Sequence, residues 1–100
     1  MKVTKTKDIT KLTVNVSGRV DAVTAPELAG EVAPALDCIE NLVINLAELE
    51  YISSAGMRVL LQFQKTMMAK KGLLTLRGMS EDVYKIFRET GLTNVFNITK

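Results

Sequence analysis

The chain begins with two stretches in which apolar and polar positions alternate, as they do in strands. Residues 12–16 place a leucine and two valines on one face and a threonine and an asparagine on the other, which predicts a half-buried strand. Residues 3–7 alternate more weakly and carry lysines, and residues 7–10 can turn the chain between the two stretches. We therefore expect an edge hairpin whose lysine-rich first strand opposes edge-to-edge aggregation.

Apolar runs without alternation mark the middle of the sheet. Residues 41–47 contain the run Leu-Val-Ile-Asn-Leu, which is rich in branched side chains and short enough to be a strand buried on both faces. We predict that it is the central strand and that residues 48–52 form a short link after it. Residues 73–76 and 95–98 are predicted to be the last two strands.

A first helix is predicted to start at Thr24, where the sequence Thr-Ala-Pro-Glu has the form of a capping box with proline in the first turn. Apolar residues then recur at helical spacing as far as Leu36. Pro34 removes a backbone hydrogen bond and clashes with the preceding turn. The helix is therefore expected to bend or end near Ala33.

Two more helices are predicted further along the chain. Residues 54–70 have one polar line and a broad apolar arc, and Gly72 is predicted to end this helix as a left-handed cap. Ser80 is predicted to cap a third helix, which Gly91 stops. The apolar arc of the second helix consists of Met57, Val59, Leu60, Leu61, Phe63, Met67 and Met68.

These elements follow the order βαβαβαβ after one additional strand. Their connections are short, so they require crossovers that make most of the sheet parallel. We predict an α/β fold with a single domain over residues 1–100. It has a mixed, mostly parallel sheet of about five strands, an antiparallel edge strand and about three flanking helices.

Composition narrows the classes of function. Hydrophobic residues make up 47% of the chain and charged residues 24%, which provides a core and argues against disorder. The net charge of +2 is too small for a nucleic-acid footprint, so no nucleic-acid partner is expected. No apolar stretch is long enough for a membrane span and no secretion signal opens the chain, so we expect a cytoplasmic protein without a membrane partner.

Few residues suit metal, cofactor or nucleophilic chemistry. With no histidine and a single cysteine, we expect no metal site, and we expect Cys38 to be a small, partly buried hydrophobe at a strand edge. The two commonest nucleotide-binding glycine motifs are absent, so we expect no cofactor. Serine catalysis would lack a base, and Glu48 and Glu50 are expected to be solvated. We therefore expect that the protein is not an enzyme.

One segment, residues 51–58, carries a pattern that packing alone does not require. Ser53 and Ser54 stand in tandem between the predicted central strand and the apolar helix, where one serine suffices as a cap. The pair also lies at the carboxyl end of a parallel strand, where open α/β sheets place functional groups. Asp21 lies between an earlier strand and helix and is predicted to be either a turn or capping residue or a surface contact.

Four segments, taken in order, resemble the STAS domain of bacterial anti-sigma factor antagonists. Residues 18–21 (Gly-Arg-Val-Asp) match a G-x-[apolar]-D step, and residues 45–52 resemble the strand that leads to the switch. Residues 54–57 (Ser-Ala-Gly-Met) resemble the D-S-[SA]-G-[LM] switch motif, with Ser53 where the family usually has aspartate. Residues 83–92 resemble the last helix, and the resemblance covers nearly all of the chain.

The resemblance implies a phosphorylation switch. In that family the serine at the position of Ser54 is phosphorylated by an anti-sigma factor with serine kinase activity, and only the unphosphorylated antagonist binds this factor and frees sigma factor. Carried over, Ser54 is the phosphate acceptor, Ser53 is the alternate acceptor, and a phosphoserine phosphatase resets the switch. We expect a monomer that binds its partner partly through an exposed portion of the apolar arc, at Met57 and Leu61. The predicted partner-binding residues are Asp21, Thr24, Ser53, Ser54, Gly56, Met57, Arg58 and Leu61.

Two other functions stay open. A STAS scaffold without a phosphorylation cycle, as a subunit of a stress-signalling or lipid-transport assembly, is suggested by the missing aspartate before Ser54. A serine enzyme would use Ser53 or Ser54 as its nucleophile.

Overall fold

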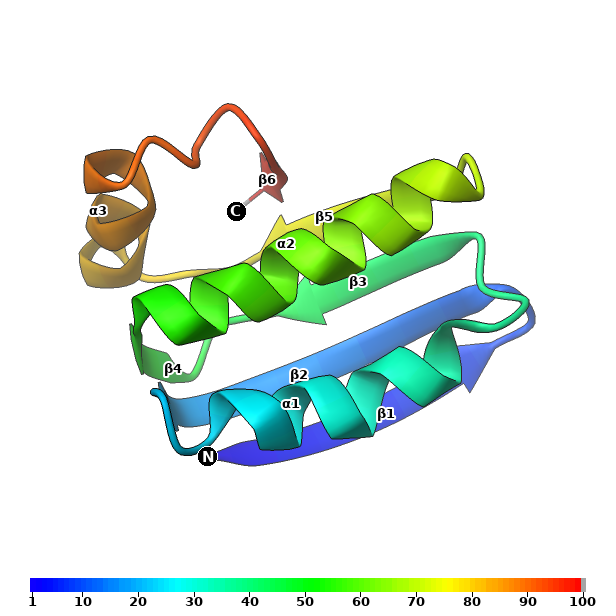
Figure 1. Cartoon of the computed structure of the whole chain (residues 1–100), viewed down its shortest axis with the longest axis horizontal. Coiled ribbons are helices and arrows are strands. Elements are labelled where there is room, and N and C mark those ends of the chain that lie inside the picture. The colour runs from blue at the N-terminus through cyan, green and yellow to red at the C-terminus, as the bar shows by residue number, and fades with distance from the viewer. Residues whose placement is uncertain (100) are drawn as a thin grey trace.

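The computed structural model describes residues 1–99, which form one sheet flanked by helices (Figure 1). The helices are α1 (Ala25–Val32), α2 (Ser54–Ala69) and α3 (Glu81–Glu89), with a short 3-10 helix, η1 (Ala33–Leu36), directly after α1. The strands are β1 (Lys2–Asp8), β2 (Lys11–Val20), β3 (Asn41–Asn45), β4 (Leu49–Ile52), β5 (Leu73–Arg77) and β6 (Asn97–Thr99).

The sheet has the strand order β1-β2-β3-β5-β6, with β4 paired to β2. β1 is antiparallel to β2, and every other pair of neighbouring strands is parallel. β3 is therefore the central strand, as its apolar run predicts, and β1 is the antiparallel edge. The predicted α/β fold with a mixed, mostly parallel sheet is confirmed.

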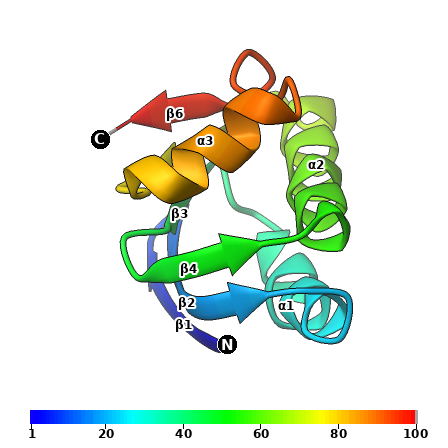
Figure 2. The same cartoon turned by 90° about the vertical axis from the view of Figure 1, so that its left-hand side faces the viewer.

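The helices divide into two groups around the sheet. α1 and α2 lie side by side on one face of the strands, as Figures 1 and 2 show, and pack against each other. α3 instead packs against β4. Among the described residues no polar or charged residue is buried, so the core between these layers is apolar; it includes Leu42, Ile44, Phe63, Met67, Leu74 and Leu76.

β4 occupies most of the segment for which only a short link is predicted, so that prediction is wrong. β2 has ten residues and an irregularity between Gly18 and Arg19. Its first half pairs with β3, and its last three residues pair with β4. β4 thus supplies the backbone partners that β3 does not provide. Four residues are too few to reveal strand periodicity in the sequence.

The connection from α1 to β3 confirms one prediction and overturns another. The α-helix ends at Val32, just before Pro34, and the chain continues as η1, as the proline predicts. Cys38, however, is exposed and has a φ of 63° in the turn that follows. The expectation of a partly buried cysteine at a strand edge is therefore wrong, because the turn directs this side chain into solvent.

α2 ends in a Schellman motif whose left-handed residue is Lys71 (φ 60°), not the predicted Gly72. The Gly72 N–H donates to the Met67 carbonyl (2.7 Å), and the Lys71 N–H donates to the Met68 carbonyl (3.0 Å). Glycine is needed at position 72 because a Cβ there would lie 2.9 Å from the Glu40 carbonyl oxygen. No helix within residues 1–99 is long and apolar enough to cross a membrane.

α3 begins and ends at the predicted signals. Ser80 Oγ accepts a hydrogen bond from the Val83 N–H (3.2 Å), and Gly91 follows the helix with a φ of 76°. The last strand, β6, starts two residues later than predicted. Phe96 lies before it and is buried, with its ring edge-on to Phe87 at a centroid distance of 5.9 Å.

Candidate functional site

The start of α2 gives the two tandem serines different roles. Ser53 is the N-cap: its Oγ accepts a hydrogen bond from the Gly56 N–H (3.3 Å), and its own N–H donates to the Val20 carbonyl of β2 (2.8 Å). Ser54 is the first helical residue and is exposed. None of the hydrogen bonds found within residues 1–99 uses the Ser54 hydroxyl. One serine therefore holds the helix, and the other presents a free hydroxyl.

Gly56 allows α2 to start close to the sheet. This residue is buried, and a Cβ on it would lie 2.7 Å from both Ile52 Cγ1 on β4 and Val20 Cγ1 on β2. Any larger residue would force the Ile52 or Val20 side chain, or the helix itself, to shift. Gly56 belongs to the predicted binding set, but the geometry gives it a packing role that determines where Ser54 sits.

Asp21 and Thr24 organise the loop between β2 and α1. Asp21 Oδ1 accepts hydrogen bonds from the N–H groups of Thr24 and Val23 (both 3.0 Å), and the Thr24 hydroxyl accepts from the Asp21 N–H (2.9 Å). The backbone hydrogen bond from Thr24, followed by that from Val23, lowers the pKa of Asp21 below its ordinary value. Of the two roles left open for Asp21, this geometry favours the turn residue.

The capping box predicted from Thr24 to Glu27 is wrong. Thr24 already has helical dihedral angles and its side chain accepts no hydrogen bond from the first turn of α1. Its hydroxyl lies instead 3.1 Å from the Arg19 carbonyl oxygen, an acceptor in the preceding strand. Thr24 therefore ties the loop back to β2, a contact that the local motif does not reveal.

Arg19 and Tyr51 form a contact that no local sequence pattern predicts. The two residues are register partners on β2 and β4, and the Arg19 guanidinium carbon lies 4.5 Å from the centre of the Tyr51 ring. This cation–π contact holds the arginine against the sheet. The pair becomes visible only when β4 is placed beside β2.

The apolar arc contributes less exposed surface than expected. Met57 is only 3% exposed, and Thr90 Oγ1 lies 3.4 Å from its sulfur, so the expectation of an exposed Met57 is wrong. Leu61 is half-buried. Val23, in the loop before α1, is 85% exposed and was missed. It lies at the same end of the molecule as Ser54, because β2 and β4 are parallel neighbours.

Arg58 and Leu61 share a helical face with Ser54. The three residues are spaced at i, i+4 and i+7 on α2, and Arg58 is exposed. Neither of the ion pairs found within residues 1–99 involves Arg58. α2 contains no acidic residue at all. The free hydroxyl therefore has an uncompensated cation one helical turn away.

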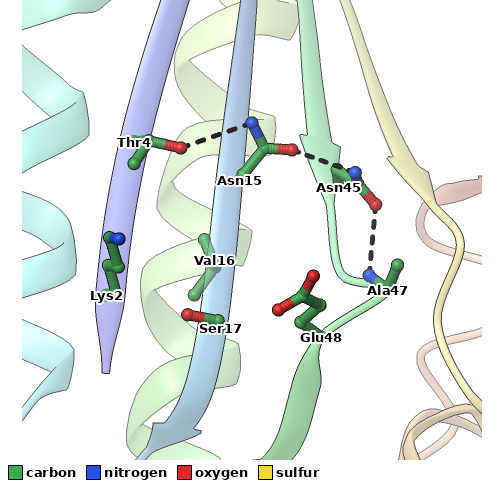
Figure 3. Close-up of a pocket in the computed structure, with 8 residues that line it drawn as sticks. All are labelled: Lys2, Thr4, Asn15, Val16, Ser17, Asn45, Ala47 and Glu48. Carbon is green, nitrogen blue, oxygen red and sulfur yellow. Dashed lines mark hydrogen bonds between the residues drawn. The ribbon is translucent and has the colours of Figure 1, made fainter.

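The open face of the sheet carries a separate polar hollow of about 210 Å³ (Figure 3). Asn45 Nδ2 donates to Asn15 Oδ1 (2.9 Å), and Asn15 Nδ2 donates to Thr4 Oγ1 (3.3 Å). These side chains are therefore hydrogen-bonded to one another. The hollow contains none of the predicted site residues. Its lining consists of Lys2, Thr4, Asn15, Val16, Ser17, Asn45, Ala47 and Glu48.

Comparison with characterised proteins points to one family. The model of the STAS domain matches residues 1–100. The anti-sigma-B factor antagonist of Listeria monocytogenes is 30% identical over 96 residues, which are 94% of this chain and 83% of that protein. BtrV of Bordetella bronchiseptica is 33% identical over 99 residues, which are 98% of this chain and 85% of that protein.

The fold is also similar to solved structures. The anti-sigma factor antagonist SpoIIAA in its unphosphorylated form superposes with a TM-score of 0.85 at 17% identity, covering 99% of this chain and 89% of that one. SpoIIAA of Bacillus in its phosphorylated form gives a TM-score of 0.76 at 16% identity, covering 99% and 92%. The domain match and the two relatives together show that this chain belongs to the STAS domain family and is related there to the anti-sigma factor antagonists.

Proposed function

We propose that this protein is an anti-sigma factor antagonist that acts by binding rather than by catalysis. Its unphosphorylated form binds an anti-sigma factor with serine kinase activity in the cytoplasm and so frees sigma factor. Phosphorylation of Ser54 ends the binding, and a phosphoserine phosphatase restores it. The observation that carries this proposal is the free, exposed hydroxyl of Ser54 beside a second serine that already caps the helix.

Ser54 suits the acceptor role better than Ser53. The Ser53 oxygen is engaged as the cap of α2, and losing a cap costs about 1 kcal/mol. The Ser54 hydroxyl has no such role, and a phosphate there would lie close to the free N–H groups of the first turn, which favour anions. In the reaction the γ-phosphoryl group of ATP bonds to Ser54 Oγ, ADP leaves, and the hydroxyl proton passes to a base of the kinase.

The docking surface that we propose consists of Val23, Ser54, Arg58 and Leu61. It combines one strongly exposed apolar side chain, one half-buried leucine, a cation and the free hydroxyl. Phosphate adds about −1.5 to −2 charges, and burying a charge without a matching partner costs several kcal/mol. Because about 2.7 kcal/mol corresponds to a hundredfold change in affinity, one phosphate is enough to switch binding off.

The related proteins support this assignment. The Listeria relative is named for antagonism of an anti-sigma factor, and SpoIIAA, a protein of the same fold, has been solved in both phosphorylation states. What differs here is Ser53, which stands where the family motif usually has aspartate. This change favours, as a second candidate, a STAS scaffold that recruits partners without a phosphorylation cycle.

Incubation with the cognate anti-sigma kinase and ATP tests the proposal. Mass spectrometry is expected to find one phosphate on Ser54, to find it still in Ser53→Ala and to lose it in Ser54→Ala. Phosphate on Ser53 alone would reassign the acceptor. If no phosphate is added although the protein captures other partners from its host, the scaffold is the correct function. Light scattering is expected to show a monomer.

A further inference from the structure

Arg58 is placed to reach whatever is attached to Ser54. The two residues are four apart on α2, and side chains with this spacing are neighbours on a helix surface. Helical side chains also lean toward the N-terminus, so that each covers the turn before its own Cα. For Arg58 that turn is the one that begins with Ser54. Both residues are exposed.

Arg58 has no partner among the described residues, whereas Arg19 and Lys5 do. Arg19 lies against the Tyr51 ring, and Lys5 is paired with Glu31 (3.2 Å). Arg58 takes part in neither of the ion pairs and none of the hydrogen bonds found within residues 1–99. Because α2 has no acidic residue, its own helix offers no carboxylate to compete for this guanidinium.

We propose that Arg58 binds the phosphate when Ser54 is phosphorylated, within the same helix. A guanidinium presents a planar fork of N–H donors that matches two oxygens of a phosphate group. The inference rests on the proposed function, in which Ser54 is the acceptor. Arg58 is a positioning residue in this scheme, since it takes no part in the transfer of the phosphoryl group.

The pair makes phosphorylation change the docking surface in two ways. The phosphate introduces negative charge, and the capture of Arg58 removes the exposed positive charge of the docking surface at the same time. A partner whose carboxylates complement Arg58 in the unmodified protein would lose its counter-ion and face a phosphate in its place. One modification thus reverses the sign of the charge presented at the start of α2.

The test uses phosphoserine installed at position 54 during synthesis by genetic encoding, so no kinase is needed. Melting temperatures are compared for the unmodified and phosphorylated forms of the wild type, of Arg58→Gln and of Lys65→Gln. Lys65 is a matched control, because it is exposed on the same helix but lies 11 residues, or about 16 Å, from Ser54. Phosphorylation is expected to raise the melting temperature of the wild type and of Lys65→Gln by about 1 to 4 °C more than that of Arg58→Gln. High salt is expected to reduce this difference.

NMR of the Arg58 Nε–H provides a second readout that general stabilisation would not move. On phosphorylation its resonance is expected to shift and its exchange with water to slow. If phosphorylation raises the melting temperature equally in all three proteins and leaves the Nε–H signal unchanged, Arg58 does not bind the phosphate. Absence of Ser54 labelling by the cognate kinase would overturn the phosphorylation cycle instead, so the two failures are distinguishable.

Discussion

α2 and α3 both start with a serine cap, yet the residues of their first turns differ in charge and in packing. Ser53 and Ser80 each accept a hydrogen bond from the N–H three residues later. In α3 the next two residues are Glu81 and Asp82, whose charges favour the positive end of the helix dipole. In α2 they are Ser54 and an alanine, and the turn has no acidic residue.

The third helical position differs just as strongly. In α3 it is Val83, a fully buried core residue, and in α2 it is Gly56, which brings the helix backbone close to β2 and β4. The start of α3 is thus built for local stability. The start of α2 depends on close packing and leaves room for a charge at its first residue. A phosphate on Ser54 would give the start of α2 the negative charge that two carboxylates give the start of α3.

The largest effect is expected from adding a Cβ at the third position of α2. Gly56→Ala brings this atom to 2.7 Å from Ile52 and Val20, so we expect the free energy of unfolding to fall by about 1 to 3 kcal/mol in urea denaturation. Gly30→Ala is the control, since nothing lies within 4 Å of its Cβ position in α1, and this change is expected to stabilise the protein. If Gly56→Ala leaves the free energy of unfolding unchanged, the close approach of α2 to β2 and β4 is not needed for stability.

A negative charge at the first position of α2 is expected to weaken partner binding without harming the fold. Ser54→Asp should reduce affinity for the anti-sigma kinase tenfold or more, about 1.4 kcal/mol, as measured by calorimetry. Its melting temperature should stay level or rise, because the acid lies at a helix N-terminus. Ser54→Ala should bind normally. A Ser54→Asp variant with unchanged affinity would separate Ser54 from the docking surface.

The caps Ser53 and Ser80 are expected to contribute similarly to the free energy of unfolding. Ser53→Ala and Ser80→Ala each remove one hydrogen bond to the third N–H, so each should lower the free energy of unfolding by about 1 kcal/mol. Ser54→Ala removes no such bond and should change it by less than about 0.5 kcal/mol. A larger loss from Ser54→Ala than from Ser53→Ala would reverse the roles assigned to the two serines.

The smallest effect on stability is expected from Asp21, in the loop between β2 and α1, and it depends on pH. Hydrogen bonds in the folded state lower the pKa of Asp21, so its carboxylate contributes stability above the unfolded value near 3.8. This contribution is lost as the pH falls through the lower, folded pKa. As the pH falls through the acid range, the melting temperature of the wild type should therefore fall by more than that of Asp21→Asn. Parallel pH profiles for the two proteins would remove Asp21 from this role.

Features encoded by neighbouring residues were predictable. The central strand follows from the apolar run at residues 42–46, the end of α1 from Pro34, and both ends of α3 from Ser80 and Gly91. Each of these signals acts through the backbone within one or two turns, so the sequence alone contains the information. The tandem serines at the start of α2 were recognisable for the same reason.

Features that depend on distant residues were not predictable. Met57 occupies a position on α2 that periodicity cannot distinguish from exposed ones, but Thr90 at the end of α3 contacts its sulfur. Thr24 carries a capping motif, yet its hydroxyl turns to the Arg19 carbonyl in β2. In both cases a partner from elsewhere in the chain overrides the local preference.

The different roles of Ser53 and Ser54 show which features the sequence determines and which need the tertiary structure. The sequence by itself places two serines at a helix start, and only motif resemblance distinguishes between them. The tertiary structure distinguishes them physically: the Ser53 N–H donates to the Val20 carbonyl, which extends the pairing of β2 with β4 to the first residue before the helix. Because that strand pairing holds Ser53 outside α2 as its cap, the helix begins at Ser54 and its hydroxyl remains exposed.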